Sequence, residues 1–79
     1  MPKMINLANL PLNHTAIVAD VRTDTVAGQR LQEFGLIAGT RVTCVLRSPM
    51  GDPAAYLIRG AVIAVRSADA SNVTVAEAT

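Results

Sequence analysis

The sequence predicts a mainly β protein, a small and partly open barrel of about five strands with one helix inserted after the first barrel strand. Three observations lead to this prediction. Short segments alternate apolar and polar side chains, one segment changes to a helical period, and turn-forming residues separate the segments. Closing a sheet also protects its strand edges, which suits a chain of only 79 residues. We therefore expect residues 1–79 to form a single domain.

The first barrel strand is expected over Thr15–Arg22, which is rich in β-branched residues. The clearest strand is Arg41–Arg47. Val42, Cys44 and Leu46 alternate along it and are expected to share its inner face, because every second residue of a strand points the same way.

Two further strands, Ala55–Arg59 and Ala61–Arg66, flank Gly60. A glycine inside a continuous strand pattern marks a bulge or a sharp bend, so we expect a curved hairpin or a barrel corner there. Asn72–Ala76 is expected to close the barrel as a short last strand. Residues 1–13, with Leu7, Leu10 and Leu12, are expected to form a leading segment that packs on the barrel.

A helix of about three turns is expected between the first two strands, capped by Asp24 or Thr25. Gly35 would end it in a left-handed conformation, and Ala38 with Gly39 would then form a tight turn. Four apolar residues are expected to share one stripe of this helix, and Phe34 is assigned to the core: Val26, Ala27, Leu31 and Phe34. The loop Ser48–Pro53, including Gly51 and Pro53, carries dense turn chemistry.

Composition narrows the function. With 51% hydrophobic and 16% charged residues the chain is too apolar to be disordered. Its seven basic residues are scattered and its net charge is +1, so no block of charge indicates a nucleic-acid or membrane surface. The stretch from Met4 to Ala19 is broken by polar residues and proline, and predicts neither a signal peptide nor a membrane helix. A lone cysteine excludes an internal disulfide and favours a cytoplasmic location.

Metal chemistry and catalysis are not expected. Cys44 and His14 stand alone, whereas soft or borderline metals need clustered ligands, so we predict no metal and no cofactor. Cys44 is expected to be buried and inert, and His14 to be solvated or capping. Ser48 and Ser67 have no local base to activate them, so an enzyme is not expected.

An ordered series of short segments resembles the FeoA family over nearly the whole domain. The series is Gly35–Val42, Pro49–Pro53, Tyr56, Arg59–Gly60 and Ile63–Arg66. One departure is Ala38, where the family usually has proline. Alanine adopts the same φ but restricts the unfolded chain less, so we expect a loss of about 0.4–1 kcal/mol in folding stability and no change in the turn. The resemblance implies an SH3-like barrel that assists bacterial ferrous-iron uptake by contacting the cytoplasmic GTPase portion of the FeoB permease.

A second function class stays open, a small-barrel regulator domain that binds nucleic acid or a transcription factor. The chain has only two aromatic residues, Phe34 and Tyr56, to stack on bases, and has no room for a helix-turn-helix unit, so we favour protein contact.

Several strands carry apolar residues on both faces, and the second-face residues either pack under the helix and leading segment or form an exposed contact patch. For the patch we choose Leu57, with Tyr56, Arg59 and Val45 beside it.

Overall fold

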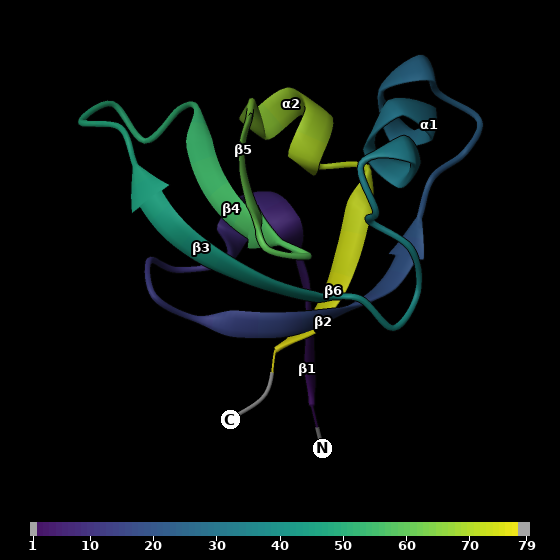
Figure 1. Ribbon diagram of the computed structural model, residues 1–79, viewed down its shortest axis with the longest axis horizontal. Helices are drawn as coiled ribbons and strands as arrows, with labels where there is room; N and C mark the ends of the chain where they lie inside the picture. Colours follow the sequence, from purple (N-terminus) through teal and green to yellow (C-terminus); the bar gives the residue numbers. More distant parts are fainter. Residues whose placement is uncertain (1, 78–79) are drawn as a thin grey trace.

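The computed structural model describes residues 2–77, which form one antiparallel sheet with helical segments at its open side (Figure 1). The strands are β1 (Lys3–Asn6), β2 (Thr15–Val21), β3 (Arg41–Arg47), β4 (Ala54–Ile58), β5 (Ala61–Val65) and β6 (Val73–Glu77). The helices are the 3-10 turn η1 (Leu7–Asn9), α1 (Val26–Glu33) and the short α2 (Ser67–Ala70). The mainly β prediction, with one substantial helix after the first barrel strand, is confirmed.

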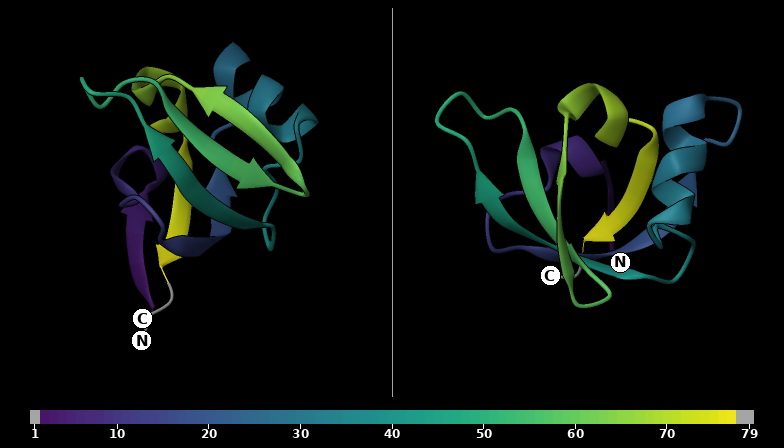
Figure 2. Two further views of the ribbon diagram at one scale, coloured as in Figure 1. Left: turned by 60° about the vertical axis from the view of Figure 1, so that its left-hand side comes forward. Right: turned by 45° about the horizontal axis from the view of Figure 1, so that its top comes forward.

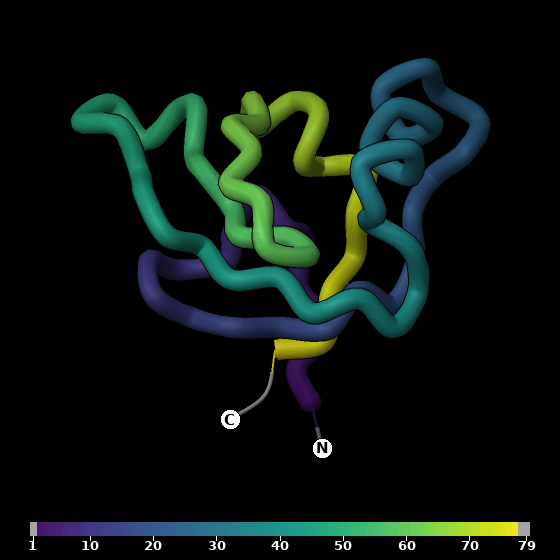
Figure 3. Tube along the Cα trace, viewed as in Figure 1, coloured from purple at the N-terminus to yellow at the C-terminus, as the bar shows by residue number. Residues whose placement is uncertain are grey.

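The sheet curls into a partly open barrel, as the trace in Figure 3 shows. Its strand order is β1-β6-β2-β3-β4-β5, so β1 and β5 are its edges. Neither β1 nor α2 was expected from the sequence. β1 is only four residues long and is held by its pairing with β6. No local sequence pattern predicts this pairing.

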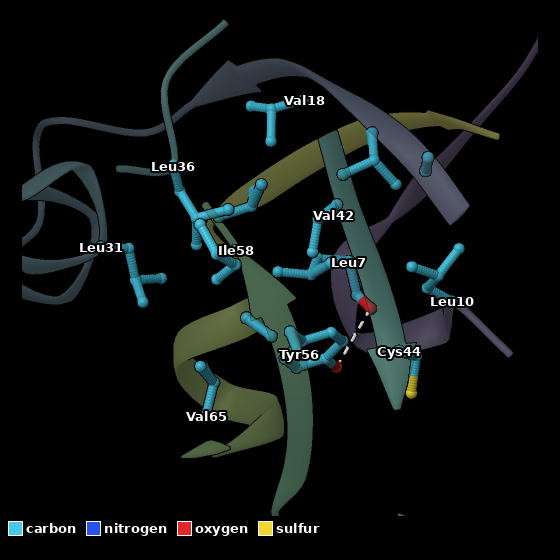
Figure 4. Packing of buried hydrophobic residues seen from close by; sticks show 14 of the residues in the cluster. Leu7, Leu10, Val18, Leu31, Leu36, Val42, Cys44, Tyr56, Ile58 and Val65 are labelled. Atoms are coloured by element: carbon cyan, nitrogen blue, oxygen red, sulfur yellow. Dashed lines mark hydrogen bonds between the residues drawn. The ribbon is translucent and has the colours of Figure 1, made fainter. Parts of the chain in front are cut away.

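The core lies inside the curl and is lined by the inner faces of all the strands except β1, whose Ile5 is partly buried against it. Figure 4 shows the packed side chains, with Tyr56 and Ile58 of β4 facing Val42 of β3. Leu7 and Leu10 of the leading segment are fully buried, whereas Leu12 is exposed.

The expected inner face of β3 is right for Val42 and Cys44, which are fully buried, and wrong for Leu46, which is 62% exposed. The pairing register of β3 with β4 shifts between Cys44 and Leu46. Val45 is thus an extra residue in a β-bulge, and a one-residue insertion moves the side chains beyond it to the opposite face.

Of the two predicted N-caps, Asp24 and Thr25, helix α1 uses Thr25, whose hydroxyl oxygen accepts the Gly28 N–H at 3.0 Å. The expected apolar stripe is wrong, because Leu31 is buried but Val26 and Phe34 are 67% and 55% exposed. The helix instead packs through Gly28 and Leu31. A Cβ atom at Gly28 would lie 1.6 Å from the carbonyl oxygen of Arg22, so the backbones touch there and turn the rest of the stripe outward.

Two glycines set the path from α1 into β3. Gly35 and Gly39 have φ values of +106° and +95°, in the left-handed region that favours glycine. The β4–β5 connection is a tight two-residue hairpin, because Arg59 and Gly60 both have positive φ, as a type I′ turn requires.

Replacing Gly35 with valine is expected to lower the free energy of unfolding by more than about 1 kcal/mol, because a β-branched side chain is strained at positive φ. Its Cβ would also lie 2.9 Å from Cδ of Arg59. Gly39→Val is the matched comparison, since φ is again positive but no atom lies within 4 Å of the added Cβ. Urea unfolding should show the larger loss for Gly35→Val, and an unchanged melting temperature would contradict the account.

Tyr56 joins the core to the leading segment. Its side chain is buried and its hydroxyl donates to the carbonyl oxygen of Leu7 at 3.3 Å (Figure 4). Burial raises the pKa of this phenol above its ordinary value of 10.0. Since the folded state favours the protonated form, the phenol stabilises the fold fully below pH 10 and loses this contribution as the pH rises through its folded pKa.

Tyr56→Phe is therefore expected to cost about 1 kcal/mol at neutral pH, because the Leu7 carbonyl loses one of its two hydrogen bonds and keeps that from the Leu10 N–H. Above about pH 10 the loss should shrink, because phenylalanine has nothing to ionise. Chemical denaturation at both pH values measures the difference. A constant gap between the two proteins would show that the phenol titrates alike in the folded and unfolded states.

Candidate protein-contact surface

Exposed apolar side chains gather on the outer face of β3, β4 and β5, which lie side by side in the left view of Figure 2. Residues directly opposite each other in a sheet share a face. One row runs from Thr43 through Leu57 to Val62, and the next runs from Leu46 through Ala55 to Ala64. We call Leu46, Ala55, Leu57, Val62 and Ala64 the outer-face patch.

The large side chains of the patch are exposed, whereas Ala55 between them is buried. Val62, Leu46 and Leu57 are 63%, 62% and 39% exposed, and each stands on a paired strand. Strands β3, β4 and β5 contain no acidic residue. A contiguous apolar surface of this kind is typical of protein-contact sites.

Arginines border the patch at one end. Arg41 shares the outer face with Thr43, and Arg59 lies in the hairpin turn that follows Leu57. The two side chains border a hollow of about 390 Å³ together with Ala38, Gly39 and Thr40. Neither guanidinium forms an ion pair with a residue in the range 2–77, so both can receive an acidic group from a partner.

The four residues that the sequence analysis chose as contact residues differ in where they lie and how exposed they are. Leu57 lies near the centre of the outer-face patch, and Arg59 is exposed at its end. Val45 is the partly buried extra residue of the bulge. Tyr56 is 1% exposed and points into the core, so the expectation that it contacts a partner is wrong. Tyr56 and Leu57 are neighbours in a strand, and only one of them can face outward.

Of the five patch members only Leu57 was chosen from the sequence, and Leu46, Ala55, Val62 and Ala64 were not. Leu46 was assigned inward because the period of two was followed through the bulge. The segment Arg41–Arg47 contains no glycine, which would have signalled a bulge in the strand. Ala64 is a small residue whose place follows only from its register opposite Ala55.

The side chains most suited to catalysis or metal binding are either buried or bonded to other residues. Cys44 is fully buried, and the His14 ring is paired with the Glu77 carboxylate at the surface. Asp52 accepts the Ser67 N–H at 2.9 Å and the Ser67 hydroxyl at 3.1 Å, an arrangement that starts α2. Within residues 2–77 no three His, Cys, Asp or Glu side chains are grouped as metal ligands would be.

No helix in the described part of the chain is long and apolar enough to span a membrane.

The model of the FeoA domain family matches residues 5–77. The chain belongs to the FeoA family. The expected resemblance is thereby confirmed, and the family associates the chain with ferrous-iron transport. No curated protein sequence matches it.

Solved FeoA structures share the fold. The FeoA-like protein of Clostridium acetobutylicum is 24% identical with a TM-score of 0.91, and the alignment covers 100% of this chain and 92% of that one. Stenotrophomonas maltophilia FeoA, solved with zinc and described as a prokaryotic SH3-domain protein, is 29% identical with a TM-score of 0.80, covering 90% and 88% of the two chains. The SH3-like fold is thus confirmed.

A manganese-dependent transcriptional repressor shares the same fold at 18% identity and a TM-score of 0.83. This chain covers only 44% of that repressor, so the likeness concerns the barrel alone.

Proposed function

We propose that this FeoA-family protein is a non-enzymatic accessory factor of bacterial ferrous-iron uptake, acting in the cytoplasm by docking its outer-face patch on the GTPase portion of the FeoB permease. The observation that supports this most is the placement of Leu46, Leu57 and Val62 on one exposed, arginine-bordered face. For S. maltophilia FeoA, a role as a ferrous-iron transport activating factor has been suggested.

The patch suits a reversible contact. Full burial of a leucine or valine side chain contributes about 1.5–3 kcal/mol, whereas association costs roughly 4–15 kcal/mol. Three large apolar side chains therefore offset only part of that cost, and polar contacts at the border must add to them. The resulting complex would dissociate readily, as a regulatory contact requires.

The arginine border adds orientation. Arg41 and Arg59 would meet acidic groups of the permease, which speeds encounter and makes it sensitive to salt. The hollow between Arg41 and Arg59 lies at the hairpin end of the patch, so this end would face the acidic groups of the permease.

Calorimetric titration of the 79-residue protein with the soluble GTPase portion of the permease, with and without guanine nucleotide, tests the proposal. We expect saturable binding that weakens as salt rises. Duplex DNA of mixed sequence serves as a parallel titrant. Binding to DNA that persists at physiological salt, with none to the GTPase portion, would reject the proposal in favour of a regulator domain.

A further inference from the structure

A groove separates α1 from the free edge of β5, and it adjoins the outer-face patch at Ala64. The right view of Figure 2 shows the β5 edge directed toward the side of the molecule that carries α1. The groove has a volume of about 380 Å³. Its walls include Val26 and Phe34 from α1 and Ile63 and Ala64 from β5. The outward-turned stripe of α1 is therefore one wall of this groove.

The backbone of β5 offers unpaired groups to the groove. In a two-residue hairpin the residues that flank the turn, Ile58 and Ala61, form a hydrogen-bonded pair. Bonded and non-bonded pairs alternate along an antiparallel ladder, so Val62 and Ala64 direct their N–H and C=O groups away from β4. No other backbone group of residues 2–77 bonds to them.

The β5 edge also lacks the usual protection. Edge strands normally carry a charged residue, a proline or a bulge that prevents pairing with another chain. The other edge, β1, is short and begins at the exposed Lys3. β5 consists of five apolar residues paired to β4 without a register shift. Its free edge is chemically ready to accept another strand.

The groove is also lined by two charged side chains. Arg30 of α1 and Asp69 of α2 both line it, and neither has an ion-pair partner among residues 2–77. A strand placed in the groove can therefore offer an acidic side chain to Arg30 and a basic one to Asp69. A groove of about 380 Å³ with α1 as one wall suits a single extended segment rather than the whole face of a second barrel.

We propose that the groove between α1 and β5 binds an extended apolar segment of a partner protein, added to the sheet as a further strand next to β5. The backbone of the segment bonds to Val62 and Ala64, and its apolar side chains contact Phe34 and Val26. Strand addition of this kind takes affinity from main-chain hydrogen bonds and specificity from side-chain pockets. The site shares Val62 and Ala64 with the outer-face patch but uses their backbone groups, so strand addition does not depend on the proposed docking to FeoB.

The probes are two capped seven-residue peptides of alternating valine and threonine, one with glutamate first and lysine last, the other with that order reversed. Nuclear magnetic resonance titration of the labelled 79-residue protein follows their binding. We expect saturable shifts at Val62, Ala64 and Phe34, slower hydrogen exchange of the Val62 and Ala64 amides, and at least a tenfold preference for one charge order. No binding up to millimolar peptide, or shifts confined to other strands, would overturn the proposal.

Ala64→Pro removes one free N–H at an edge position where proline is tolerated, and Ala64→Ser is its matched control because it keeps the N–H. We expect at least tenfold weaker peptide binding for Ala64→Pro and little change for Ala64→Ser. Equal binding by both variants would overturn strand addition. If Ala64→Pro fails to fold, the exchange measurement on the unmodified protein decides. Concentration-dependent dimers that Ala64→Pro abolishes would show that a second copy occupies the edge, which also contradicts the proposal.

Discussion

Replacing Leu57 with glutamate is expected to weaken binding to the permease's GTPase portion by about 30-fold or more and to abolish support of ferrous-iron uptake. The side chain lies near the centre of the outer-face patch, where a buried charge without a partner is costly. A loss of about 2 kcal/mol is the size of a contact hot spot and corresponds to this factor. The fold should survive, because Leu57 is 39% exposed.

Met4→Glu is the matched control. Met4 is 56% exposed on β1, four strands away from β4 in the sheet order. Melting, binding and uptake should be measured on both variants. If Leu57→Glu unfolds, Leu57 belongs to the core after all. If it folds and transport is normal, the contact surface lies elsewhere.

Gly28→Ala is expected to destabilise the protein by about 3 kcal/mol, the upper range for forcing volume into a packed site. Helix propensity alone predicts the opposite sign, since alanine is favoured over glycine inside a helix by about 1 kcal/mol. Here the added Cβ would lie 1.6 Å from the Arg22 carbonyl oxygen, which is backbone and cannot rotate away. The helix would have to move off the end of β2, uncovering Leu31.

Gln32→Ala, on the exposed face of the same helix, controls for helix propensity and should change the free energy of unfolding by less than about 0.5 kcal/mol. Urea denaturation of both variants measures the difference. Greater stability of Gly28→Ala would show that the helix does not depend on close packing at this glycine.

Local patterns in the sequence predict most of the fold. Enrichment in β-branched residues locates β2 and the period of two locates β3, and the turn glycines Gly35 and Gly39 stand where the backbone has positive φ. These features depend on residues close together in the chain. The same is true of the Thr25 cap, which needs only the N–H of Gly28.

What the sequence could not predict depends on contacts between distant segments. The orientation of α1 follows from the backbone contact between Gly28 and Arg22, so Phe34 faces a groove rather than the core. The exposure of Leu46 follows from a bulge that becomes visible only in the register with β4. The sequence therefore predicted Leu57 as part of the contact surface but not most of the residues that surround it.

The most direct test of the outer-face contact is a methyl-labelled nuclear magnetic resonance titration of this protein with the GTPase portion of the permease. Two exposed apolar regions of the sheet compete in this measurement, the patch on β3–β5 and the outer row of Met4 and Ile17 on β1 and β2. The proposed function predicts that the methyl signals of Leu46, Leu57 and Val62 shift together and saturate, while those of Met4 and Ile17 stay in place. Saturable shifts at Met4 and Ile17 with an unperturbed Leu57 would contradict it.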